Sequence, residues 1–237
     1  MHKIIDWMGD MLYPPRCPIC DRVGKLGDRG ICSECMHKTK YILPPRCMKC
    51  GKHIEDVSEE YCGDCAKGVH YYVRGRSLFA YKDIAKSLYR FKYKGRREYA
   101  LVYGREMAYF LGDMIRDWKA DALVPVPLYK TRERRRGYNQ AELLAGVLGK
   151  ELGIPVNKDL VKRIENTMPL KMLNPEERLN NLKKAFILME NGVKLKRVIV
   201  VDDIYTTGST IDALAQVLLE WGAEEIFFVT LAIGENV

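Results

Sequence analysis

The spacing of hydrophobic and polar positions changes near residue 71, after which short apolar runs alternate with amphipathic stretches. Val198–Val201 is entirely apolar, which is typical of a parallel strand covered on both faces, whereas Thr210–Trp221 has its apolar residues at helical spacing. This alternation predicts an α/β domain over residues 71–237, built on a parallel, doubly wound sheet flanked by helices. The predicted elements are strands at Arg74–Tyr81, Ala122–Leu128, Val198–Val201 and Ile226–Ile233, and helices at Ile84–Tyr93, Tyr99–Trp118, Gln140–Leu152 and Thr210–Trp221.

Residues 1–70 lack this alternation and form a separate predicted lobe. The first of them place Ile4, Ile5, Met8, Met11 and Leu12 on one helical face, which indicates a short docking helix. Nothing in the chain approaches the ~18 unbroken apolar residues of a membrane span. The start of the chain also lacks the apolar core of a secretory signal. We therefore expect a cytoplasmic protein with no membrane insertion.

All eight cysteines lie in this first lobe, as four Cys-x-x-Cys pairs in two sets that repeat at an interval of thirty residues. The pairs are Cys17/Cys20, Cys32/Cys35, Cys47/Cys50 and Cys62/Cys65. Each pair can turn two thiolates toward one metal, and two pairs complete a tetrahedral structural zinc site. The repeat predicts a double zinc ribbon holding two structural zinc ions, one per set, with an interleaved pairing as the second choice. A disulfide framework is disfavoured by the missing signal peptide, and a redox role by the likeness of the four pairs.

Positive charge is concentrated in two stretches of the second lobe, residues 82–97 and Lys130–Arg136. The whole chain carries 39 Lys and Arg against 31 Asp and Glu, a net charge of +8, which suits a polyanionic partner. Cations and tyrosines interleave between residues 82 and 97, a composition that suits stacking of bases along a phosphate backbone. A solvated helix face with apolar anchors explains the same composition slightly better. The candidate nucleic-acid contacts are Lys86, Arg90, Lys92, Tyr93, Lys94, Arg96 and Arg97.

The most informative segment for chemistry is 198–210, VIVVDDIYTTGST. Ligands bind at the carboxyl ends of strands in such sheets, where Asp202 and Asp203 follow the predicted strand. Thr206, Thr207, Gly208, Ser209 and Thr210 then open the next helix, and their hydroxyls and free N–H groups make a phosphate cradle. Carboxylates suit ribose hydroxyls, directly or through Mg²⁺. The segment therefore predicts a pocket for a sugar phosphate.

Three other structures could carry a segment of this kind. Only 34 residues follow Asp203, too few to build a receiver domain that begins with paired aspartates. The loop lacks the lysine of a nucleoside-triphosphate P-loop. Spacing alone leaves open that the aspartates merely cap a turn.

The segment resembles the phosphoribosyl pyrophosphate (PRPP) motif of type I phosphoribosyltransferases. Together with FKYKG at Phe91–Gly95, VPVP at Val124–Pro127, RRGYNQA at Arg135–Ala141 and the cysteine pairs, it resembles the ComF family of competence proteins over essentially the whole chain. The resemblance implies that Asp202 and Asp203 hold the ribose hydroxyls and that Thr206–Thr210 hold the 5-phosphate. It also implies a pyrophosphate, with Mg²⁺, near Arg136, Gly137, Asn139 and Gln140.

A hood segment is also similar to the family, from Arg163 through Thr167 and Arg178 to Phe186, but Leu170 stands where a glutamine is usual. This departure leaves the acceptor of any transfer reaction undefined, and the sequence offers no evident general base. Nothing resembles a glutaminase domain. The resemblance implies a role in uptake or processing of transforming single-stranded DNA with competence-machinery proteins. The alternatives are a metabolic phosphoribosyltransferase and a PRPP sensor without turnover.

Overall fold

The computed structural model describes residues 14–164, 185–189 and 194–234. The predicted docking helix of residues 1–13 lies outside these ranges, as do Thr167, Leu170 and Arg178 of the hood segment.

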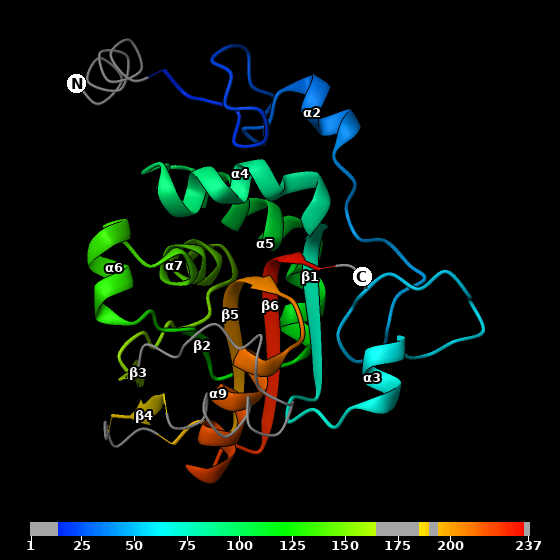
Figure 1. Ribbon diagram of the computed structural model, residues 1–237, viewed down its shortest axis with the longest axis vertical. Helices are drawn as coiled ribbons and strands as arrows, with labels where there is room; N and C mark the ends of the chain where they lie inside the picture. The colour runs from blue at the N-terminus through cyan, green and yellow to red at the C-terminus, as the bar shows by residue number, and fades with distance from the viewer. Residues whose placement is uncertain (1–13, 165–184, 190–193, 235–237) are drawn as a thin grey trace.

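A four-stranded parallel sheet forms the centre of the larger lobe (Figure 1). Its strands lie in the order β1 (Arg74–Ala80), β6 (Glu225–Ile233), β5 (Arg197–Tyr205) and β2 (Ala122–Pro125), and all neighbouring pairs are parallel. The predicted parallel sheet is confirmed. β5 extends past the apolar run because its backbone stays paired with β6 as far as Tyr205, opposite Ile233. Asp202 and Asp203 therefore lie within the carboxyl-terminal part of the strand and not after it.

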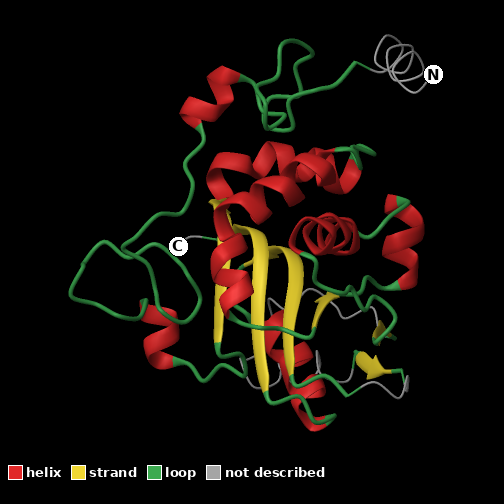
Figure 2. Cartoon of the chain, turned by 180° about the vertical axis from the view of Figure 1, so that it is seen from behind, coloured by secondary structure: helices red, strands yellow, loops and turns green. Residues whose placement is uncertain are grey.

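Helices cover both faces of this sheet. α4 (Tyr81–Tyr93), α5 (Tyr99–Asp117) and α7 (Gln140–Leu152) pack on the face that carries Ile199 and Val201, toward the viewer in Figure 2. α9 (Ser209–Glu220) packs on the opposite face, against Val198 and Val200. Successive β5 side chains point to opposite faces, so burial of both faces explains why the run contains no polar residue.

Three elements of the larger lobe were not predicted. α6 (Lys130–Arg136) has the sequence KTRERRR, which offers no apolar stripe, and it contains no buried residue. β3 (Val161–Arg163) and β4 (Phe186–Leu188) form a small antiparallel pair. Each strand has three residues, too few for a periodic pattern to distinguish them from loop.

The cysteine-rich residues form two small units, each with one short helix, α2 (Ser33–Lys38) and α3 (Gly63–Lys67). The first unit lies above α4 and α5, and the second lies beside β1, at the opposite edge of the sheet from α6 (Figure 1). Among the described helices, none combines the length and apolarity needed to cross a membrane.

Candidate functional sites

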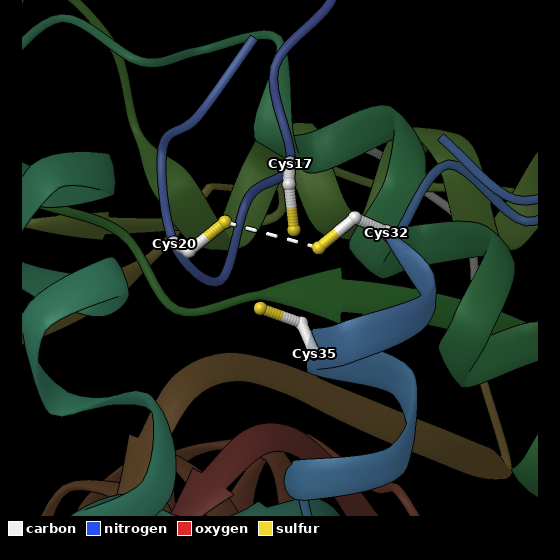
Figure 3. A group of neighbouring side chains, drawn as sticks. All are labelled: Cys17, Cys20, Cys32 and Cys35. Carbon is white, nitrogen blue, oxygen red and sulfur yellow. Dashed lines mark hydrogen bonds between the residues drawn. The ribbon is translucent and has the colours of Figure 1, made fainter. Parts of the chain in front are cut away.

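The eight cysteines form two groups of four. One group is Cys17, Cys20, Cys32 and Cys35, whose sulfurs converge in Figure 3, and the other is Cys47, Cys50, Cys62 and Cys65. Within each group all Sγ atoms lie within 4.8 Å of one another. The Cys20 and Cys32 sulfurs are 3.9 Å apart, and those of Cys50 and Cys62 are 3.7 Å apart. Thiolates placed tetrahedrally about 2.3 Å from zinc lie about 3.8 Å from one another. The groups therefore fit two structural zinc ions with the predicted pairing of one ion per repeat, and not the interleaved pairing.

The first ribbon (residues 14–38) is held to α4 and α5 by polar contacts. Arg90 donates to the Ile19 carbonyl at 2.6 Å. Asp21 accepts from the Tyr99 hydroxyl at 2.5 Å and pairs with Arg96, whose Nε is 3.3 Å away. Two of the predicted nucleic-acid cations thus bind the ribbon.

A buried carboxylate on α5 adds a second anchor for this lobe. Glu106 has no exposed surface. Its carboxylate accepts from the Tyr41 hydroxyl at 2.5 Å and lies 3.4 Å from Nε of Arg29. Burial raises the pKa of Glu106, opposed by the Tyr41 hydrogen bond and the charge of Arg29.

The two aspartates of the 198–210 segment occupy different surroundings at the end of β5. Asp203 is buried, whereas Asp202 is half-buried and accepts from the Asp203 N–H at 2.7 Å. Partial burial, followed by the negative charge of Asp203, raises the pKa of Asp202 to about 7, while Lys92 and Arg163 act in the opposite direction. A carboxyl group with a pKa raised this far beside a second carboxyl group is typical of a ligand site.

The hydroxyl-rich loop follows at once and turns the chain into α9. Thr206 and Thr207 are exposed, and the Thr207 hydroxyl lies 2.9 Å from that of Ser209. Gly208 caps the helix with φ of 82°, a left-handed conformation that glycine adopts at low cost. The first N–H groups of α9 therefore point out of the helix end beside these hydroxyls, where they suit a phosphate.

Lys92 reaches this site from the last turn of α4. Its ammonium lies 2.8 Å from Oδ1 of Asp203, and both side chains are largely buried. Sequence reasoning assigned Lys92 to a nucleic-acid surface and missed this contact. One signal could have found it: Lys92 belongs to the FKYKG motif, which resembles the same family as the motif that contains the aspartates. The two motifs are about 110 residues apart in the sequence.

The predicted pyrophosphate residues surround the junction between α6 and α7. Arg136 donates to Oε1 of Gln140 at 2.8 Å and lies over the Tyr93 ring at 5.0 Å. Asn139 caps α7 by accepting from Ala141 N–H at 3.0 Å, and its amide donates to the Val126 carbonyl just beyond β2. Gly137 ends α6 with φ of 79°. Asn139 and Gln140 are buried, so they shape this junction; their contact with pyrophosphate stays a prediction.

The remaining residues of the predicted nucleic-acid stretch lie at the surface. Lys86, Tyr93, Lys94 and Arg97 are exposed, and the Tyr89 and Tyr93 rings lie 5.2 Å apart on α4. Arg90, Lys92 and Arg96 make the internal contacts described above. The stretch therefore contains both kinds of residue that its composition allowed, anchors for the fold and a solvated basic face.

Family models match both lobes. Residues 8–66 match a double zinc ribbon domain, and residues 134–235 match a phosphoribosyl transferase domain. The chain is 34% identical to Competence protein F of Haemophilus influenzae, over 89% of this chain and 93% of that protein. This chain belongs to the ComF family.

Two further relatives agree with this assignment. Competence protein ComFC of Bacillus subtilis is 32% identical, over 82% of this chain and 80% of that protein. DNA utilization protein YhgH of Escherichia coli is 32% identical, over 91% of this chain and 96% of that protein. A purine phosphoribosyltransferase from Pyrococcus horikoshii aligns over 55% of this chain and 73% of its own with a TM-score of 0.35 and 18% identity, which adds nothing to the assignment. The ComF chain thus combines a phosphoribosyltransferase-like domain with two ribbons.

Proposed function

We propose that this ComF-family chain binds PRPP at the carboxyl end of β5 and acts in the uptake or processing of single-stranded DNA. One observation carries the first part: paired aspartates and the hydroxyl-rich loop share one strand end, with the free N–H groups of α9 beside them. Ribose hydroxyls would bind Asp202 and Asp203, and the 5-phosphate would bind Thr206–Thr210.

Magnesium fits the same strand end by the chemistry of its donors. Mg²⁺ prefers carboxylate and phosphate oxygens, and both kinds would meet beside Asp202 and Asp203. When bound with PRPP, the ion would neutralise pyrophosphate charge. The positive charge of Lys92 lies beside Asp203 in the structure, so we infer that the ion pair holds this carboxylate in position for the ligand. Arg136, Gly137, Asn139 and Gln140 are the proposed pyrophosphate neighbours.

The DNA role rests on the relatives and on the basic face of α4. The names of three relatives refer to competence or to DNA utilization. Lys86 and Lys94 are exposed, and the exposed Tyr89 ring would stack a base. Such a role would place the protein in the cytoplasm beside other competence proteins.

Calorimetric titration of the full chain with PRPP tests the pocket. We expect binding that strengthens when Mg²⁺ is present and that falls at least tenfold in Asp203→Asn. Arg105→Ala is the control, because Arg105 lies on α5 and pairs with Glu151 outside the site. No binding by wild type, or equal binding by Asp203→Asn, would contradict the proposed pocket.

Anisotropy of a labelled single-stranded oligonucleotide tests the DNA role separately. Binding should be strongest at low salt, where phosphate contacts dominate affinity. Failure to bind at 50 mM salt would remove this part of the proposal and leave the PRPP pocket standing.

Two further functions stay as alternatives for the same pocket. A metabolic phosphoribosyltransferase would release pyrophosphate when a base or another nucleophile is added. A PRPP sensor would bind PRPP without turning over any acceptor. Leu170, the residue that departs from the family pattern, lies outside the described residues. Pyrophosphate release assayed across candidate acceptors, with Asp202→Asn as the inactive control, separates the two alternatives.

A further inference from the structure

Two tyrosines connect the second zinc ribbon (residues 44–67) to the hydroxyl-rich loop (residues 206–210). Tyr72 lies between this ribbon and β1, and Tyr205 is the last residue of β5, directly before Thr206. Their hydroxyl oxygens are 2.8 Å apart. Both side chains are almost completely buried. A hydrogen bond between two buried hydroxyls is costly to break, because each group would be left without water or another partner.

Tyr205 supports the loop from below. A Cβ atom added at Gly208 would lie 2.7 Å from the Tyr205 hydroxyl oxygen, so the left-handed turn of the loop rests directly on this group. The Tyr205 ring is stacked on Phe228 of β6, with centroids 4.7 Å apart and planes 3° from parallel. The position of the hydroxyl is therefore fixed by the sheet on one side and by Tyr72 on the other.

Tyr72 is in turn held by the second ribbon. Its ring packs edge-on against Phe228 at 4.8 Å, and the Lys49 ammonium lies 5.5 Å from the ring centroid. Lys49 belongs to the knuckle between Cys47 and Cys50, and its carbonyl accepts from Gly75 N–H of β1 at 2.7 Å. Three of the ribbon's four cysteines share one apolar cluster with Tyr72, Tyr205 and Phe228.

A second set of contacts joins the segment that follows this ribbon to α9. Nδ1 of His70 lies 2.8 Å from Oδ2 of Asp212 in the first turn of this helix, and the Tyr71 N–H donates to Oδ1 of Asp212 at 2.9 Å. The Asp212 N–H itself donates to the Gly208 carbonyl at 2.8 Å. The chain leaving the second ribbon is thus bonded to the turn that opens the helix.

The first ribbon has no part in these contacts among the described residues. Cys17, Ile31 and Cys35 form a separate cluster with Val102 of α5, and the polar contacts of this ribbon go to α4 and α5. The two repeats are alike in sequence, but they dock on different parts of the larger lobe.

We propose that Tyr72 and Tyr205 are positioning residues that tie the phosphate loop to the second zinc ribbon, so that full PRPP affinity depends on the second zinc ion more than on the first. This inference rests on the proposed PRPP pocket. Without the second ion the knuckle that holds Tyr72 loses its fixed geometry, because structural zinc contributes directly to folding. Tyr205 then loses its partner, and the loop loses its support.

Conservative tyrosine variants test the link itself. Tyr72→Phe and Tyr205→Phe should each weaken PRPP binding by about threefold to tenfold in calorimetry, the effect of one buried hydrogen bond. Tyr103→Phe is the matched control, because Tyr103 is as buried and its hydroxyl contacts Ser87 behind the first ribbon. Equal affinity in wild type and in both test variants would overturn the role of the tyrosine pair.

The internal repeat supplies a matched pair of zinc variants, since Cys32 and Cys62 hold the same position in the two ribbons. With the full chain, Cys62→Ser should weaken PRPP binding on the order of tenfold and should speed amide hydrogen exchange over residues 204–210 without ligand. Cys32→Ser should have a smaller effect on both. Equal effects of the two variants would overturn the proposal. If wild type binds no PRPP, the proposed function fails, and the exchange rates still decide the link.

Linkage gives a reciprocal readout that can first be measured on the wild-type chain. Because coupling between two sites acts equally in both directions on binding free energies, PRPP with Mg²⁺ should raise the zinc affinity of one of the two sites and so protect it in equilibrium competition with a colorimetric chelator. Cys32→Ser, which retains the second site, should keep this protection, and Cys62→Ser should lose it. Protection of both ions to the same degree, or of neither when PRPP is bound, would contradict the link.

Discussion

Asp202 and Asp203 are neighbours in sequence, yet the fold places them in different surroundings. Asp203 is buried against the ammonium of Lys92, whereas Asp202 is only half-buried and has a pKa raised to about 7. The sequence could predict both as ligand residues, because their types and their place before the loop suffice. It could not predict the difference, because Lys92 comes from a helix 110 residues earlier.

We predict that Asp202→Asn stabilises the protein at alkaline pH while it removes PRPP binding. The native pKa of about 7 lies above the ordinary value of 3.8, so the folded state holds the proton more tightly than the unfolded state. The contribution of Asp202 to the free energy of unfolding is therefore fully present below about pH 4 and is lost as the pH rises through 7. Thermal denaturation should show a higher midpoint for Asp202→Asn than for wild type at pH 8, with the difference vanishing near pH 4.

Asp203→Asn is the control for this prediction. It removes the carboxylate that pairs with Lys92 and leaves a largely buried ammonium without its partner, so its midpoint at pH 8 should fall below that of wild type. The thermal midpoint of a chain of this size shifts by about 2–4 °C for each kcal/mol of change in the free energy of unfolding. A thermal midpoint for Asp202→Asn that is no higher than that of wild type at pH 8 would contradict the raised pKa of Asp202.

At the scale of elements, hydrophobic spacing predicted the segments that bury apolar side chains and missed those that do not. β5 and α9 were predicted because their residues pack into the core. α6 was missed because none of its residues is buried, and α4 was predicted from Ile84 although it begins at Tyr81, an exposed residue. Composition could not decide whether the basic residues near α4 bind nucleic acid or anchor the fold. It does not distinguish Arg90, which donates to the Ile19 carbonyl, from Lys94, which is exposed.

The basic face of α4 gives a prediction about salt dependence. Replacing Lys86 and Lys94 together by alanine should weaken single-stranded DNA binding at low salt and flatten the plot of log affinity against log salt by about 0.7 for each lost phosphate contact. Arg105→Ala, on the outer side of α5, should leave the slope unchanged. An unchanged slope in the double variant would move the DNA surface away from α4.

Arg90 and Arg96 should behave differently from the exposed lysines. Arg90→Met and Arg96→Met remove contacts to the first ribbon at Ile19 and Asp21. Each should lower the thermal midpoint by a few degrees, since hydrogen bonds that involve charged groups contribute about 1.5–3 kcal/mol and 1 kcal/mol corresponds to about 2–4 °C. Differential scanning calorimetry measures this shift. Midpoints equal to that of wild type would mean that these contacts do not hold the ribbon.

The whole molecule is a phosphoribosyltransferase-like domain held at two places by two zinc ribbons. The thirty-residue repeat predicted two ions and their pairing, because each set alone supplies four ligands. It could not predict that one ribbon docks on α4 and α5 and the other on β1, since docking depends on contacts such as Tyr41 with Glu106 that lie far apart in sequence. The division of the chain near residue 70 stays a prediction.

The pairing leads to a simple stoichiometry. Purified wild type should contain two zinc ions per chain by elemental analysis, and Cys32→Ser and Cys62→Ser should each contain one. Because ribbons of this size depend on metal for folding, chelation should also lower the thermal midpoint. Loss of both ions in a single variant would contradict two independent sites.

Amide hydrogen exchange with and without PRPP and Mg²⁺ tests the central claim most directly, because it locates the ligand on the chain. Our account predicts slower exchange over residues 203–210 when PRPP is present, with weaker protection near residues 136–140 and none in Asp203→Asn. Unchanged exchange over residues 203–210 at saturating PRPP, or protection confined to another part of the chain, would contradict the assignment of this strand end as the PRPP site.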